Sequence, residues 1–180
     1  MSAFVRLQKT YGVYLHWSGL TAGYMTLAMM LLVGSNVITR YIFNYSIPGT
    51  LEFTESMLTV LIFLSLALTQ YEGGHIQVVL LTKKLPSSAR RIVMVLTLLL
   101  GVAFFSWCSW GAWQYAMKSF MINEQQWGSV RFTLYPIKFV LFIGLLSLAI
   151  QFVFDAISTA LGLDPHEKED TSKTTLEESI

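Results

Sequence analysis

Charged residues are scarce in this sequence. Asp, Glu, Lys and Arg make up 13% of its 180 residues, and hydrophobic residues make up 54%, whereas a soluble globular chain carries about 25% charged residues. So few charges do not cover the surface of a water-soluble fold. The net charge of +1 also lacks the basic excess that favours nucleic-acid binding. The sequence therefore predicts an integral membrane protein that binds no nucleic acid.

Cysteine occurs once, at Cys108, so the chain forms no internal disulfide and has no cysteine pair with metal-ligand spacing. The sequence also lacks a nucleophile–base pairing, a phosphate-binding glycine loop and a histidine–carboxylate cluster. These absences exclude the common catalytic and metal-binding patterns. We predict no enzyme activity, no cofactor and no metal site.

Four long segments carry almost no charge, and each is long enough to cross a bilayer, which takes about 20 apolar residues. We expect membrane-spanning helices at about 16–39, 50–71, 91–117 and 134–161, joined by short loops. Lipid tolerates only helices or closed barrels, and the period-two alternation of barrel strands is absent. The predicted fold class is an all-α integral membrane protein, with residues 1–163 forming one four-helix membrane domain.

Two shorter stretches are apolar but too short to span. One is residues 75–84, and the other precedes the first span and contains Phe4 and Tyr11. We expect both to form amphipathic helices at the membrane surface. Residues 164–180 are rich in Asp, Glu, Lys, Ser and Thr, which is typical of a disordered tail.

Basic residues predict the orientation in the membrane. Lys and Arg are more frequent on the side that holds the middle loop and both termini (Arg6, Lys9, Lys83, Lys84, Arg90, Arg91) than on the other (Arg40, Lys118, Arg131, Lys138). Because basic residues favour the cytoplasmic side, we expect both termini in the cytoplasm and lipid contacts along the spans.

Polar residues gather at the outer ends of the first two spans. Asn36 and Arg40 are four residues apart, and Glu52 and Glu55 are three apart, so each pair shares a helix face. The short loop allows an Arg40–glutamate pair between the helices. Such a group is either an ion or proton site or a structural pair that docks a partner; its shallow depth favours the structural reading. His75 could bind a cofactor or respond to pH, but a hydrogen bond to the loop backbone or a neighbouring subunit is favoured.

Three tryptophans, Trp107, Trp110 and Trp113, recur every three residues in the third span. They form a stripe that could dock another membrane protein or pack within the bundle, and the sequence leaves both open. Gly19 and Gly23 form a small-xxx-small pair in the first span, which permits close helix approach.

A family resemblance rests on the region from Asn36 to Arg91. Its motifs are Asn36-Val-Ile-Thr-Arg-Tyr-Ile-Phe-Asn44, then Ile47-Pro-Gly-Thr-Leu-Glu52, Gly74-His-Ile-Gln-Val78 and Leu85-Pro86. In this order and spacing they resemble the small membrane subunit (DctQ-like) of tripartite ATP-independent periplasmic (TRAP) transporters.

The resemblance implies a scaffold subunit in the bacterial inner membrane. It implies a heterodimer with a large membrane subunit that carries substrate and sodium, and a periplasmic binding protein that delivers organic acids such as sialic acid or dicarboxylates. The motif positions carried over are Asn36, Arg40, Asn44, Glu52 and His75. Many members have two adjacent acids at the start of the second span. Here the two acids, Glu52 and Glu55, are three residues apart. Either of them could correspond to the family's characteristic acid at this position.

Two other functions compete with this one. A stand-alone proton-coupled carrier would use Glu52 or Glu55 as its coupling acid, although a carrier needs such an acid near the bilayer centre. A membrane anchor of a redox complex would hold haem or quinone, but facing histidines deep in the spans are missing.

Overall fold

A computed structural model describes residues 2–72 and 87–161, and these residues form four helices. In chain order they are α1 (Ser2–Phe43), α2 (Thr50–Tyr71), α4 (Ser87–Met121) and α5 (Tyr135–Ala160). All four are long and apolar enough to cross a membrane. The predicted all-α membrane fold is confirmed. The expected surface helix at 75–84, His75 and the tail at 164–180 lie outside the described residues.

The first helix is longer than a single span requires. It begins at Ser2, so the stretch that contains Phe4 and Tyr11 is the start of α1 and not a separate surface helix. Its 42 residues rise about 63 Å at 1.5 Å per residue, against a hydrocarbon core of about 30 Å. The helix therefore either tilts strongly or extends well beyond the core.

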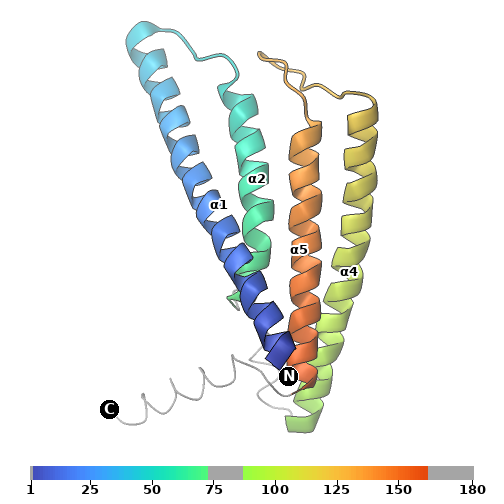
Figure 1. Cartoon of the computed structure of the whole chain (residues 1–180). Helices are drawn as coiled ribbons and strands as arrows, with labels where there is room; N and C mark the ends of the chain where they lie inside the picture. The colour runs from blue at the N-terminus through green and yellow to red at the C-terminus, as the bar shows by residue number, and fades with distance from the viewer. Residues whose placement is uncertain (1, 73–86, 162–180) are drawn as a thin grey trace, which may run out of the picture.

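The helices lie side by side in the row α1, α2, α5, α4 (Figure 1). The α1–α2 and α4–α5 connections lie at one end of the row, here called the connection end, and the N-terminus lies at the other, the terminal end (Figure 1). Near the terminal end α1 packs against α2 and α5, and it leans away from α2 toward the connection end (Figure 1). The first helical hairpin consists of α1 and α2, and the second consists of α4 and α5. The two hairpins meet along α2 and α5.

A small apolar core joins α1, α2 and α5. Leu15, Ala67 and Leu148 are fully or almost fully buried there. Beside them the Tyr11 hydroxyl donates a hydrogen bond to the backbone carbonyl of Ser147 at 2.6 Å. This contact ties the start of α1 to α5 as well as to its direct neighbour α2.

Close approach between helices depends on particular glycines. A Cβ on Gly144 of α5 would overlap the backbone carbonyl of Phe63 in α2, and one on Gly19 of α1 would overlap the Leu68 side chain. A Cβ on Gly23 would meet no heavy atom within 4 Å. The predicted close approach therefore holds at Gly19 but not at Gly23, because Gly23 lies on an exposed side of α1 while the adjacent Ala22 is buried.

Candidate functional site

The α1–α2 connection is shaped by two asparagines and a glycine. The Asn36 side-chain oxygen accepts the backbone N–H of Ile47 at 2.8 Å and the hydroxyl of Ser46 at 3.3 Å. Asn44 has a left-handed backbone with φ 51°, and Gly49 has φ 84°. Asparagine and glycine are the residues that adopt this conformation most easily, so Asn44 ends α1 and Gly49 precedes α2. Asn36 then holds the connection against the last turns of α1.

Glu52 lies in the first turn of α2 and is only 7% exposed. Its carboxylate accepts the backbone N–H of Ser129 at 2.5 Å. Ser129 belongs to the segment Ile122–Leu134, here called the α4–α5 loop. A Cβ on Gly128 would overlap the Glu52 carboxylate, so the loop approaches this closely because residue 128 has no side chain. Glu52 thereby joins the two helical hairpins at the connection end.

Apolar contacts reinforce this junction. The rings of Phe53 and Phe132 stack with their centroids 5.4 Å apart and an interplanar angle of 8°. A methyl group of Val130 packs against the Cα of Gly49, where a Cβ would come within 2.8 Å of it. The α4–α5 loop is therefore held by both the start of α2 and the α1–α2 connection.

The α4–α5 loop also has hydrogen bonds of its own. The backbone N–H of Gln126 donates to Phe132 at 2.8 Å, and that of Leu134 donates to Glu124 at 3.0 Å. Gln125 and Thr133 form an isolated antiparallel bridge. These contacts give the loop the shape of a short hairpin whose tip is residues 127–131.

An ion pair closes the base of this loop. Lys138 in the first turn of α5 is buried and pairs with Glu124. Its ammonium also lies 3.7 Å from the centroid of the Tyr115 ring, a cation–π contact. The hydrogen bond from Lys138 is the main cause that holds the pKa of Glu124 below its ordinary value of 4.5.

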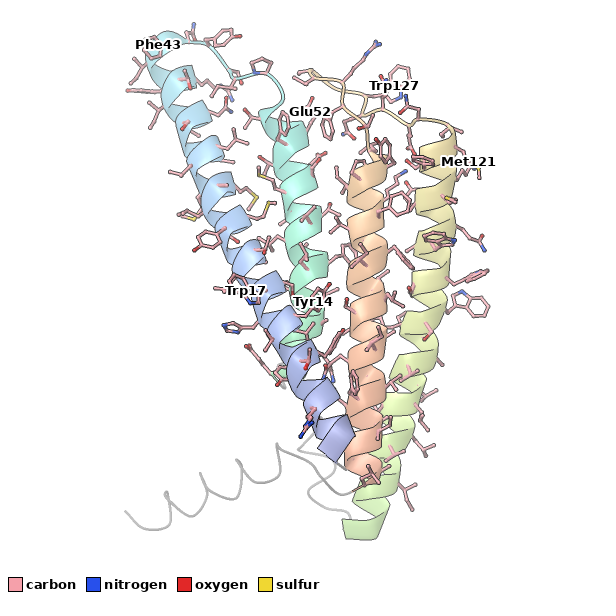
Figure 2. All side chains as sticks on the ribbon, in the orientation of Figure 1. Tyr14, Trp17, Phe43, Glu52, Met121 and Trp127 are labelled. Atoms are coloured by element: carbon pink, nitrogen blue, oxygen red, sulfur yellow. The ribbon has the colours of Figure 1, made fainter. Side chains whose placement is uncertain are left out.

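The expected pairing of Arg40 with a glutamate is wrong. Arg40 and Glu55 are both exposed, and the ion pair among the described side chains at this end of the protein is Lys138–Glu124. The cause is the lean of α1, whose last residue Phe43 lies well apart from Glu52 in Figure 2. Of the two candidate acids, Glu52 is therefore the one built into the junction.

The tryptophan stripe on α4 divides into two parts. Trp113 packs against Phe139 and Phe142 of α5, with ring centroids 6.0 Å and 5.2 Å away. Trp107 is 83% exposed and Trp110 is 67% exposed. Trp113 therefore packs within the bundle, whereas Trp107 and Trp110 point outward from it.

One polar cluster was missed by the sequence reasoning. Near the terminal end, Gln70 of α2 donates to Asp155 of α5 at 2.6 Å, and Gln151 donates to the other oxygen of the same carboxylate at 2.8 Å. Asp155 is visible in the sequence as a charge within a span. The glutamines carry no charge and show no signal of this kind. The cluster joins α2 to α5, as Glu52 joins the hairpins at the opposite end.

These features define a class of protein: a small multi-pass membrane protein whose polar contacts join its helices and loops, with exposed tryptophans on one edge helix. A family model described as "Tripartite ATP-independent periplasmic transporters, DctQ component" matches residues 29–162. The match covers more than half of the chain, and the chain belongs to this family as a small membrane subunit of a TRAP transporter. This confirms the resemblance found in the sequence. No curated protein matches the chain.

Proposed function

We propose that this subunit is a scaffold that binds and steadies a large, substrate-carrying membrane subunit in the bacterial inner membrane. The assembled system would import organic acids, such as sialic acid or dicarboxylates, together with sodium ions, and a periplasmic binding protein would deliver the substrate. The family match to the DctQ component is the observation that carries this proposal.

The arrangement of the helices supports a scaffold role. A row of helices buries little of its own surface, and large apolar side chains are exposed on every helix. Such a row can lie against a larger membrane protein over a wide area. The exposed Trp107 and Trp110 are on α4 at one edge of this row, where a partner would find large, rigid aromatic side chains.

The polar groups at the connection end support the same role. Glu52 is engaged by the backbone of the α4–α5 loop, and Lys138 by Glu124. Both contacts hold the row of helices together at its connection end. A coupling acid of a stand-alone carrier has to exchange its proton or ion during each transport cycle, whereas Glu52 is built into a fixed junction.

The distribution of basic residues supports an orientation with both termini in the cytoplasm. The connection end then faces the periplasm, with the α4–α5 loop outside the membrane. This places the junction built around Glu52 on the side from which a binding protein approaches.

Co-expression with the cognate large subunit tests the proposal. An affinity tag on this chain should recover both subunits in a constant ratio through detergent extraction and size-exclusion chromatography. Proteoliposomes with both subunits should take up organic acids only when a sodium gradient and the binding protein are supplied. A purified chain that stays free of the large subunit, or that transports organic acids alone, would overturn it.

A further inference from the structure

The tip of the α4–α5 loop has an inward and an outward side. Gly128, Ser129 and Val130 contact Glu52 and the α1–α2 connection. The two residues that flank them, Trp127 and Arg131, are exposed, and Trp127 is 93% exposed. Figure 2 shows Trp127 on the loop beyond the ends of α2 and α5. The loop therefore holds one large aromatic and one guanidinium group away from the protein.

This loop is held in place at several points. A carboxylate binds its backbone, a stacked phenylalanine pair anchors one side, and the Lys138–Glu124 pair closes its base. Tryptophan and arginine are the side chains most enriched at protein-binding hot spots. A surface that is already ordered loses less conformational entropy on binding, so holding these two side chains on a fixed loop favours association.

The exposed charges at the connection end are mostly positive. Arg40, Lys118 and Arg131 are exposed, whereas Glu52 is buried and Glu124 is paired with Lys138. Among the described acids of this end, Glu55 is the one that remains exposed. A partner that fits this surface has an acidic face, since complementary charges steer encounter and fix orientation.

We propose that Trp127 and Arg131 form a docking site for the periplasmic binding protein, with Trp127 entering an apolar depression and Arg131 meeting acidic side chains around it. This inference rests on the proposed function and specifies a contact that the small subunit itself makes. An anchor in the outer lipid headgroups is the competing occupant. A tryptophan can partition into the lipid headgroups without being held on an ordered loop. Trp127 is held on such a loop, and this favours a soluble protein as the partner.

Binding of the cognate binding protein to the two-subunit complex in nanodiscs tests this proposal, because both membrane faces are accessible there. Trp127→Ala should raise the Kd about tenfold or more, as expected for a hot-spot residue. Arg131→Glu should raise the Kd by a similar factor at low salt, with a smaller effect at high salt because exposed charges are screened.

Matched controls separate docking from general damage. Trp17→Ala removes another exposed tryptophan and Arg6→Glu reverses another exposed charge, both toward the terminal end, and neither should change the Kd. Gly128→Ala leaves both docking side chains intact but displaces the loop, so it should weaken binding, whereas Gly111→Ala, where a Cβ meets nothing within 4 Å, should not.

The outcomes are distinguishable. An unchanged Kd for Trp127→Ala and Arg131→Glu, with the two-subunit complex intact, overturns the docking site alone. Quenching by brominated outer-leaflet lipids that is stronger in the wild type than in Trp127→Ala, together with that unchanged Kd, assigns the residue to the membrane and also overturns the proposal. Failure of the wild-type chain to form the complex overturns the proposed function and this inference together.

Discussion

The carboxylate of Glu52 and the backbone N–H of Ser129 form a hydrogen bond of 2.5 Å between residues 77 positions apart in the chain. The bond joins the first turn of α2 to the α4–α5 loop, and hence the first helical hairpin to the second at the connection end. Gln70 and Asp155 join the same two hairpins near the terminal end. The row of helices is thus fastened by polar contacts near both ends, with apolar packing between them.

Glu52→Ala is expected to destabilise the subunit. It removes a buried side chain that accepts the Ser129 N–H in a partly buried hydrogen bond, and a hydrogen bond to a charged group contributes about 1.5–3 kcal/mol. Glu52→Gln keeps a side-chain carbonyl that can accept the same N–H, so its cost should be smaller. The thermal unfolding midpoint of the purified subunit in detergent measures both effects.

Glu55→Ala is the matched control for Glu52, since Glu55 is an exposed acid one turn away on the same helix. Exposed substitutions of this kind change the stability by less than about 0.5 kcal/mol. Equal losses in the two alanine variants would show that the Glu52–Ser129 bond does not contribute to folding.

Gly144→Ala should separate α2 from α5. The added Cβ overlaps the backbone carbonyl of Phe63, and a backbone atom cannot move aside as the end of a side chain can. Overpacking of this type costs about 1–3 kcal/mol. The expected result is a lower thermal midpoint and a smaller fraction of monodisperse protein after heating.

Gly23→Ala supplies the control for this substitution in a membrane helix. Its Cβ would meet nothing within 4 Å, so the midpoint should stay close to that of the wild type. A larger loss at Gly23 than at Gly144 would mean that Gly23 faces a neighbouring helix, contrary to the open position described here.

Composition and hydropathy predict the four membrane-spanning helices, because each long uncharged run has to adopt a hydrogen-bonded helix in lipid. Uncharged runs such as Ile92–Met117 have to be helical in a bilayer, and α4 contains the whole of this run. The turn residues Asn44 and Gly49 were also recognisable, since a left-handed backbone favours these types. The short motifs around them were sufficient to indicate the family.

Contacts across the row could not be predicted from the sequence. Periodicity places Glu52 on a helix face but does not identify which distant segment covers that face. Arg40 was the nearest cation in sequence, yet the covering group is the backbone N–H of Ser129, which carries no sequence signal. Similarly, the spacing of Gly19 and Gly23 does not show which of the two faces a neighbouring helix, and only Gly19 does so, against Leu68 of α2.

The contact between Glu124 and Lys138 should depend on pH. Lys138 lowers the pKa of Glu124 below 4.5 in the folded subunit, so the folded state binds this proton less readily than the unfolded state. The stabilisation is then fully present above pH 4.5 and is lost as the pH falls through the lower, folded-state pKa.

Thermal midpoints measured across this range for the wild type and for Glu124→Gln test the prediction. The wild type should have the higher midpoint at neutral pH, and the difference should shrink as the pH falls below 4.5. A difference that stays constant down to the most acidic condition would show that ionisation of Glu124 does not support the loop.

The tryptophan stripe should separate into residues that bind a partner and a residue that supports folding. The double variant Trp107→Ala with Trp110→Ala removes two exposed side chains, so the thermal midpoint should change little while recovery of the large subunit in co-purification falls severalfold.

Trp113→Ala should show the opposite pattern. This ring packs against Phe139 and Phe142 of α5. Its loss leaves a cavity that costs about 2–4 kcal/mol for a partly exposed aromatic, somewhat less than full burial would give. The midpoint should fall, and the surviving folded protein should still bind the large subunit. Full recovery of the large subunit by the double variant would instead assign Trp107 and Trp110 to lipid contact, since an exposed aromatic on a spanning helix has no other neighbour once a protein partner is excluded.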